Sequence, residues 1–263
     1  MKLKLYQIDA FTDKVFSGNP AAVIPLEAWL PDELMQKIAL ENNLAETAFI
    51  VPDGDEIIIR WFTPSVEVDL CGHATLAAGF VLFNYLKHSG NKINFISPRS
   101  GPLQVTKSNN LLTLNFPSDK FIPVVISDEI KAGLSLPPKE AYKGKTDYLL
   151  VYESEDQIRQ LIPDFNLISK LAARGIIVTA PGNQVDFVSR FFAPQSGVNE
   201  DPVTGSAHTT LTPYWAARLK KDILTATQLS SRTGELHCRY LGERVEISGK
   251  AAPYLVGEIG WPD

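Results

Sequence analysis

Two short glycine-containing segments of this chain have the composition of a binding or catalytic loop. The first is Cys71-Gly72-His73 and the second is Thr204-Gly205-Ser206. Each lies where a loop is expected to become a helix, so its backbone N–H groups have no helical partners and carry the positive end of the helix dipole. Such a helix start binds anions readily. The pair predicts sites for a carboxylate or a developing enolate, although for either glycine alone close packing is the simpler explanation.

Three titratable side chains near these segments could move a proton. Glu46 ends a polar run that enters an apolar strand, His73 occupies the presumed anion site, and Asp201 precedes the second segment. Carboxylates and imidazoles are the usual general acid–base groups of enzymes. The bland alternatives are a solvated strand-edge glutamate, a hydrogen-bonded histidine at a helix start, and an aspartate that caps the loop.

The sequence shows no pattern typical of a metal or nucleotide site. The four histidines do not cluster along the chain with cysteines or carboxylates at ligand spacing. A glycine-rich loop of the kind that holds phosphates is also missing from the sequence. We therefore expect neither a metal nor an organic cofactor.

A repeat relates the two glycine segments. Its matching stretches begin at Leu44 and Leu171, pass through Arg60–Pro64 and Arg190–Pro194, and end at the glycine segments. The offset grows from 171 − 44 = 127 to 205 − 72 = 133, as loop insertions would cause. The repeat predicts two duplicated halves, residues 1–116 and 117–263, with the last strand a candidate for packing on the first half. The counterpart of Glu46 is Ala173, so only one half carries this carboxylate.

The halves are expected to consist mostly of strands with one prominent helix each, which is an α+β pattern. The helix that starts at His73 is apolar on nearly every face, as is typical of a helix buried all round, and a sheet wrapped around it would bury it. The second helix is expected over residues 206–221. It contains Pro213, which should bend it unless the proline lies in the first turns.

Composition restricts the classes of function. With 263 residues, 44% hydrophobic and 21% charged, the chain is typical of a soluble globular protein. A net charge of −5 without a basic cluster argues against nucleic acid as a partner.

The first strand lacks the apolar core of a signal peptide, and the apolar stretch Leu76–Leu86 is too short to span a membrane. Two distant cysteines fit a reducing compartment. We expect a cytoplasmic protein that acts on a small anionic metabolite.

Four stretches together resemble the PhzF-like phenazine-biosynthesis family: Phe16–Val23, Asn43–Phe49, Leu70–Leu76 and Glu200–His208. The match runs from the first strand to the last. The family is similar in fold to diaminopimelate epimerase. The resemblance therefore implies two similar domains, each a mixed β-sheet rolled into a barrel around a central helix, with the active-site cleft between them. It also suggests a homodimer.

The resemblance implies an isomerase that moves a proton on a small, carboxylate-bearing, cyclic metabolite without metal or cofactor. In that function Glu46 is the acid/base, and His73 and Asp201 complete the catalytic group. Substrate binding would fall to four further residues: Asn19, Gly72, Gly205 and Ser206.

Two other functions stay open. The same fold supports racemases that use one thiol at each helix start, and Cys71 occupies the first of these positions. The repeat places Thr204 opposite it, however, and a hydroxyl cannot act as the second base at neutral pH. Cys71 is therefore expected to be a small buried residue. The second of these functions is that of a non-catalytic relative that binds a small molecule.

Overall fold

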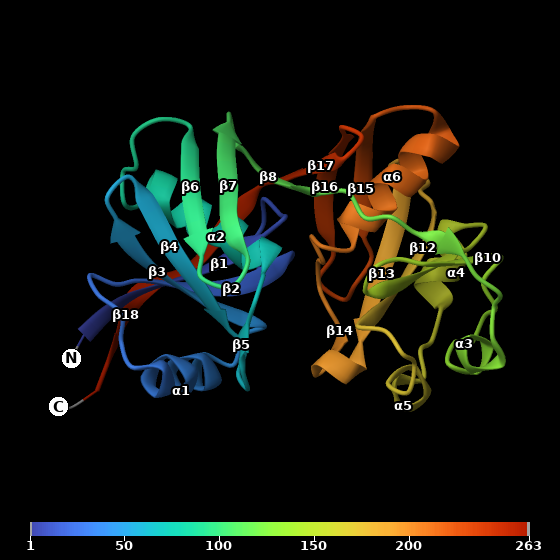
Figure 1. Ribbon diagram of the computed structural model, residues 1–263, viewed down its shortest axis with the longest axis horizontal. Helices are drawn as coiled ribbons and strands as arrows, with labels where there is room; N and C mark the ends of the chain where they lie inside the picture. The colour runs from blue at the N-terminus through green and yellow to red at the C-terminus, as the bar shows by residue number, and fades with distance from the viewer. Residues whose placement is uncertain (1, 262–263) are drawn as a thin grey trace. The chain divides into compact units, whose positions relative to one another are not determined.

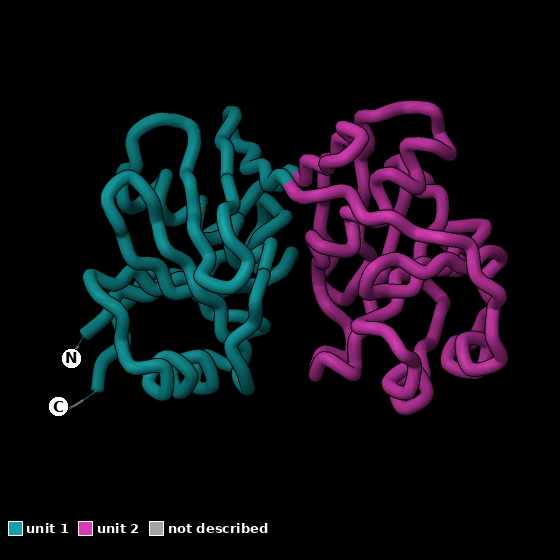
Figure 2. Tube along the Cα trace, in the orientation of Figure 1, with its two compact units in different colours: residues 1–115, 248–263 teal, residues 116–247 magenta. Residues whose placement is uncertain are grey.

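The computed structural model describes residues 2–261, whose contacts divide the chain into two compact units (Figure 2). The first unit comprises Met1–Asn115 and Ser248–Asp263, and the second comprises Phe116–Ile247. Two strands, β8 (Leu111–Pro117) and β17 (Arg244–Gly249), carry the chain from one unit to the other. The C-terminal strand therefore belongs to the first unit.

The first unit is a mixed sheet with two helices, α1 (Asp32–Asn42) and α2 (Gly72–Asn84) (Figure 1). β18 pairs with β1 antiparallel, β2 with β3 parallel, and β3 with β4 antiparallel. Besides parts of β8 and β17, the strands are β1 (Lys2–Ala10), β2 (Asn19–Pro25), β3 (Glu46–Asp53), β4 (Glu56–Phe62), β5 (Glu67–Val68), β6 (Lys92–Ser97), β7 (Gly101–Ser108) and β18 (Ala251–Gly260).

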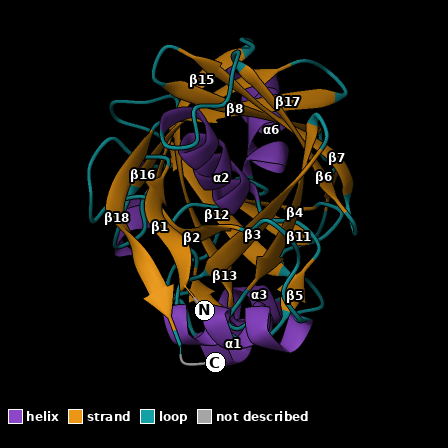
Figure 3. Ribbon diagram, turned by 90° about the vertical axis from the view of Figure 1, so that its left-hand side faces the viewer, coloured by secondary structure: helices purple, strands orange, loops and turns teal. Residues whose placement is uncertain are grey.

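Helix α2 is buried among the strands of the first unit, as its apolar sequence predicts (Figure 3). It contacts β1, β2, β3, β7 and β18. Gly79 permits the close approach to β7, because a Cβ at this position would lie 2.8 Å from Cγ1 of Val105. Neither α2 nor any other helix within residues 2–261 is long and apolar enough to cross a membrane.

The sheet register brings the start of two strands to the start of α2. β2 begins at Asn19 and β3 at Glu46, and the parallel pairing sets Ala21 opposite Glu46. Parallel neighbours start at the same edge of a sheet, and α2 packs on both strands. The first residues of β2, β3 and α2 are therefore gathered at one edge of the first unit.

The second unit is also mixed α+β. β11 pairs with β12 parallel, β12 with β13 antiparallel, and β13 with β15 parallel. The strands are β9 (Ile122–Pro123), β10 (Glu140–Lys143), β11 (Asp147–Val151), β12 (Gly175–Pro181), β13 (Phe187–Ala193), β14 (Val198–Glu200), β15 (Ile223–Gln228) and β16 (Gly234–Tyr240), besides parts of β8 and β17. The helices are α3 (Asp128–Ala132), α4 (Glu155–Gln160), α5 (Phe165–Ile168), the short 3₁₀ helix η1 (Pro194–Ser196) and α6 (His208–Leu219).

Helix α6 starts later than the sequence predicts, at His208 instead of residue 206. The preceding residues form tight turns, in which His208 N–H donates to the Gly205 carbonyl at 3.0 Å and Thr209 N–H to the Ser206 carbonyl at 3.1 Å. The helix also ends earlier, at Leu219. The N-terminal difference matters because Ser206 lies in a turn before the helix and not in its first turn.

Pro213 lies inside α6, where the sequence predicts a conflict. A proline cannot donate to the carbonyl four residues before it, which here belongs to Thr209. That carbonyl accepts the backbone N–H of Asp119 instead, at 3.1 Å. The Asp119 carboxylate also accepts from the Thr210 hydroxyl at 2.8 Å. The segment that enters the second unit thus supplies the hydrogen bond that the proline removes.

Candidate active site

Glu46, Cys71 and His73 meet in the first unit. The imidazole Nε2 of His73 lies 3.1 Å from Oε2 of Glu46, and the Cys71 Sγ lies 3.5 Å from the other ring nitrogen, Nδ1. The side chain of His73 is only 6% exposed and that of Glu46 only 18%. Glu46 is therefore not a solvated residue at a strand edge: its carboxylate faces a buried imidazole and keeps limited access to solvent.

Asn19 holds the His73 ring from the side of β2. Its side chain is fully buried, and Nδ2 lies 3.2 Å from Nδ1 of His73. An amide offers both a donor and an acceptor, so Asn19 can serve the neutral or the charged imidazole by turning about its terminal bond. The structure thus places this expected substrate-binding residue against the imidazole, where it orients His73.

The turn before β3 places Glu46. Helix α1 ends with Asn43 in the left-handed conformation, at φ 49°, which asparagine tolerates better than most residues. The Asn42 side chain then donates to the hydroxyl of buried Thr47 at 3.0 Å. This bond fixes the start of β3, so that its first residue, Glu46, reaches His73.

The charges at this cluster shift the pKa values of two groups. Burial is the largest cause at Cys71 and raises the pKa of its thiol to about 11, so the thiol is neutral at pH 7. Burial alone would lower the pKa of His73, but the neighbouring charges and hydrogen bonds of Cys71 and Glu46 raise it well above its usual value. Because the Cys71 thiol is neutral at pH 7, the contact with Glu46 is the main cause that raises the pKa of His73 there.

The same three side chains could hold a metal ion. Their donor atoms lie within 4.8 Å of one another. The expectation that no histidine clusters with cysteine or carboxylate is therefore wrong for His73, because the cluster forms only when β3 and α2 meet. Carboxylate, thiolate and imidazole are ligands that Zn²⁺ accepts, and together they would fill three of its four tetrahedral positions. A cation here would have to displace the thiol proton of Cys71.

Asp201 anchors the loop before α6 in the second unit. Its carboxylate accepts from the Thr204 hydroxyl at 2.6 Å, and its backbone carbonyl accepts from the Gln228 side chain at 2.7 Å. The Gln228 Oε1 in turn accepts the Thr204 N–H at 2.9 Å. Asp201 thus braces the loop, while α6 itself has no side-chain cap. Gln228, on β15, is a partner that the sequence did not indicate.

Ser206 is held by an arginine that no sequence motif indicated. Arg174 donates to the Ser206 hydroxyl at 3.0 Å, and its Nε donates to Asp147 at 2.9 Å. Arg174 directly follows Ala173, the counterpart of Glu46 in the repeat. The charged residue next to the counterpart of Glu46 was therefore the available signal for this partner.

Replacing Cys71 with alanine should cost stability but leave most of the turnover. The variant loses a buried sulfur and leaves a small cavity, while the contact between Glu46 and His73 stays in place. The loss of turnover should stay well below the ~10²-fold that removal of a general acid–base group causes. Urea unfolding and steady-state rates of Cys71→Ala and Cys71→Ser test this. Complete inactivation of a folded variant would show that the thiol takes part in the reaction.

Comparison with known proteins assigns the family. Residues 8–257 match the family model described as phenazine biosynthesis-like protein. An uncharacterized isomerase of Pseudomonas aeruginosa is 55% identical over 260 residues, which cover 98% of this chain and 99% of that protein. A crystal structure of a PhzF-family phenazine biosynthesis protein from Enterococcus faecalis superposes with a TM-score of 0.95 at 47% identity, covering 99% of this chain and 100% of the other.

A more distant structure shows the same fold alone. A hydroxyproline epimerase from Agrobacterium vitis, with bound trans-4-hydroxy-L-proline, gives a TM-score of 0.63 at 9% identity and covers 98% of this chain and 92% of its own. The resemblance found in the sequence is thereby confirmed. The chain belongs to the phenazine biosynthesis-like family and is an isomerase of that family.

Proposed function

We propose that this isomerase moves a proton between two carbons of a small, carboxylate-bearing, cyclic metabolite, with Glu46 as the group that carries the proton. The observation that supports this most is the contact of the Glu46 carboxylate with buried His73, at 3.1 Å. A partly exposed carboxylate that is oriented by a buried imidazole has the geometry of a general acid–base catalyst.

The proposed reaction conserves atoms and electrons. Glu46 takes a proton from a carbon next to a double bond, and the electron pair of that C–H bond moves into the neighbouring bond. The double bond shifts, and Glu46 returns the proton to the carbon at its far end. The neighbouring His73, oriented by Asn19, holds the carboxylate in place. No electron leaves the substrate, so the step needs no redox cofactor.

Backbone amides at the start of α2 and in the turn before α6 complete the proposal. In the first unit the N-terminal amide of α2 at Gly72 would stabilise negative charge that develops on the substrate. In the second unit the amides of Gly205 and Ser206 would bind a carboxylate, and Asp201 would assist proton transfer. For Asp201 this is a second role besides its bond to Thr204.

Deuterium incorporation tests the proposal on a range of candidate substrates at once. A panel of cyclic unsaturated carboxylic acids would be incubated with the protein in D₂O and followed by proton NMR. We expect at least one acid to lose a C–H signal, or to gain deuterium at a new carbon, in step with isomerisation. Exchange at an α-carbon of amino acids, with inversion and no double-bond shift, would contradict the proposal and favour a racemase.

The two-thiol racemase finds less support in the site. Cys71 is a neutral thiol with its pKa raised to about 11. The Thr204 hydroxyl donates to Asp201 and is not a base. The other cysteine, Cys238, lies in β16, and burial raises the pKa of its thiol to about 12. A mechanism in which two thiols exchange a proton lacks its second thiol at the second helix start.

The proposed step should be independent of metal. Dialysis against EDTA should leave turnover unchanged, because Glu46 itself carries the proton. Added Zn²⁺ should inhibit, because it would bind the Glu46 carboxylate together with Cys71 and His73. Rates before and after chelation, with metal content measured by atomic spectroscopy, check both expectations. If chelation abolishes turnover and Zn²⁺ restores it, the metal-free step is wrong.

A further inference from the structure

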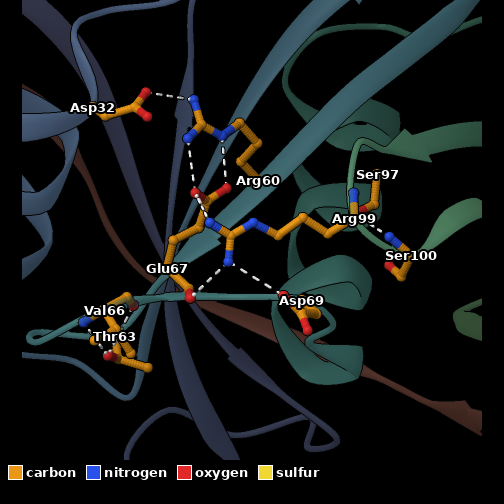
Figure 4. A network of polar contacts seen from close by, with 9 residues as sticks. All are labelled: Asp32, Arg60, Thr63, Val66, Glu67, Asp69, Ser97, Arg99 and Ser100. Atoms are coloured by element: carbon orange, nitrogen blue, oxygen red, sulfur yellow. Dashed lines mark hydrogen bonds and ion pairs between the residues drawn. The ribbon is translucent and has the colours of Figure 1, made fainter.

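The first unit contains a mostly buried arginine–glutamate fork in the segment that leads to α2 (Figure 4). Arg60 of β4 donates from Nε and Nη2 to the two carboxylate oxygens of Glu67 on β5, at 2.7 and 2.8 Å. The side chains are only 14% and 12% exposed. Two parallel charge-assisted bonds fix the orientation of both groups. We call this pair the first fork.

The second unit contains the same arrangement. Arg190 of β13 donates from Nε and Nη2 to the carboxylate of Glu200 on β14, at 2.7 and 3.0 Å. These side chains are 13% and 22% exposed. The remaining nitrogen of Arg190 donates to the carbonyls of Ile158 and Leu161, at 3.1 and 2.7 Å. This pair is the second fork.

The two forks occupy equivalent places in the two units. In the first, Phe62 pairs with Glu67 across the strands, and in the second Phe192 pairs with Glu200. Each arginine lies two residues before that phenylalanine and stacks over its ring, at 5.1 and 4.8 Å. The repeat offset is 192 − 62 = 130 at the phenylalanines and 200 − 67 = 133 at the glutamates. The fork is thus shared by both halves of the repeat.

The glutamate of each fork directly or closely precedes a segment of the candidate site in the sequence. Glu67 lies four residues before Cys71, the residue that directly precedes α2, and Glu200 directly precedes Asp201. The first fork is reinforced by Arg99, which donates to the Glu67 carboxylate at 2.7 Å and to Asp69 at 3.2 Å. Arg99 also donates to the backbone carbonyl of Glu67 at 3.2 Å.

The strands that carry the glutamates are too short to fix these segments by backbone pairing alone. β5 has two residues and β14 has three. Strands of this length contribute few ladder hydrogen bonds, whereas a mostly buried bidentate ion pair is rigid and leaves an uncompensated charge when one partner is removed. We propose that the two forks are positioning devices: each holds in place the segment of the candidate site that leads into a helix, α2 in the first unit and α6 in the second. This inference rests on the proposed function in that it takes His73 and Asp201 to be part of the reaction.

The first test compares Glu67→Gln with Glu258→Gln. Glu67→Gln removes the ion pairs with Arg60 and Arg99, whereas Glu258→Gln removes an exposed ion pair with Lys4 that joins the neighbouring strands β18 and β1. In Glu67→Gln the amides of residues 75–78, beginning with the Thr75 N–H that donates to the Cys71 carbonyl, should exchange with D₂O at least ~10-fold faster, because the start of α2 opens locally. In Glu258→Gln they should exchange as in the wild type.

The second test is kinetic and uses a substrate from the deuterium screen. Misplacement of a catalytic group by about 1 Å can cost up to ~10²-fold in rate. We expect kcat of Glu67→Gln to fall about 10-fold with KM changed less than about 2-fold. Arg99→Lys keeps the first fork and the charge, so it should retain most of kcat. Glu200→Gln, against the exposed control Glu153→Gln, repeats the test in the second unit.

The outcomes separate the two proposals. If amide exchange at residues 75–78 and kcat are the same in Glu67→Gln as in Glu258→Gln, the first fork does not position the site. If exchange rises as expected while Glu46→Gln keeps full activity, the fork stands and the Glu46 mechanism fails. If Glu67→Gln does not fold, Arg60→Lys, which keeps the charge but loses the second bond, takes its place. Unchanged exchange in that variant overturns the inference.

Discussion

Glu46→Gln should turn over substrate at least ~10²-fold more slowly than the wild type while binding it nearly as well. Glutamine keeps the shape of the side chain and can keep its contact with His73 Nε2, which lies 3.1 Å from the carboxylate. It cannot take up or return a proton. General acid–base catalysis by one placed group contributes ~10²- to 10⁴-fold, so an unchanged KM with a lower kcat is the expected signature.

The control for this variant is Glu41→Gln, an exposed glutamate in α1 of the same unit, which should behave as the wild type. Deuterium incorporation from the solvent should decrease in proportion to turnover in Glu46→Gln. A folded Glu46→Gln protein with wild-type kcat would overturn the assignment. His73 and Asp201 would then be the next groups to replace.

Acidification should destabilise the second unit through His208. This side chain is fully buried, its Nδ1 lies 2.8 Å from the Thr204 carbonyl, and burial lowers its pKa from 6.5 to about 4. Below pH 6.5 His208 binds a proton in the unfolded chain, whereas in the folded chain it binds one only near pH 4. The stability contributed by neutral His208 is therefore complete above pH 6.5 and is lost as pH falls toward 4. The loss amounts to ~3 kcal/mol at 1.36 kcal/mol per pKa unit.

The measurement is urea unfolding at pH 7, 5.5 and 4, read by hydrogen exchange of peptides from the second unit. His208→Asn can still donate to a nearby carbonyl but does not titrate. The variant should be less stable at pH 7 and should lose ~3 kcal/mol less than the wild type on going to pH 4. His73, whose folded pKa is raised, has the opposite effect: its contribution is present below pH 6.5 and decreases on the alkaline side. Equal pH slopes for the wild type and His208→Asn would show that His208 is protonated in the folded protein.

The sequence contains enough to identify the family and the segments of the candidate site, because these depend on local order. Gly72 and His73 begin a helix whose apolar faces demand burial, and the structure has this helix in the predicted place. The contact between Glu46 and His73 could be expected only from the family resemblance. Its distance depends on the parallel register of β2 and β3, which no local pattern encodes.

The features that could not be predicted from the sequence depend mainly on contacts between residues far apart in the chain. The arginines of both forks stand in the repeat, but their glutamates follow loops of different length, which hides the match when the halves are compared residue by residue. The sequence predicts the start of α6 two residues early because Gly205–Ala207 form turns whose bonds resemble those of a helix. Local rules treat Pro213 as unfavourable inside a helix. They miss the compensating hydrogen bond because its donor, Asp119, lies far away in the sequence.

The assignment of β18 to the first unit affects how the chain is made. β1, the most N-terminal strand of the described residues, pairs along its whole length with β18, the most C-terminal one. The second unit is one continuous stretch, so it can be completed while the first still lacks a strand. This reverses the usual order of co-translational folding, in which the N-terminal domain is finished first. Until β18 has been synthesised, β1 presents an open edge that could pair with other nascent chains.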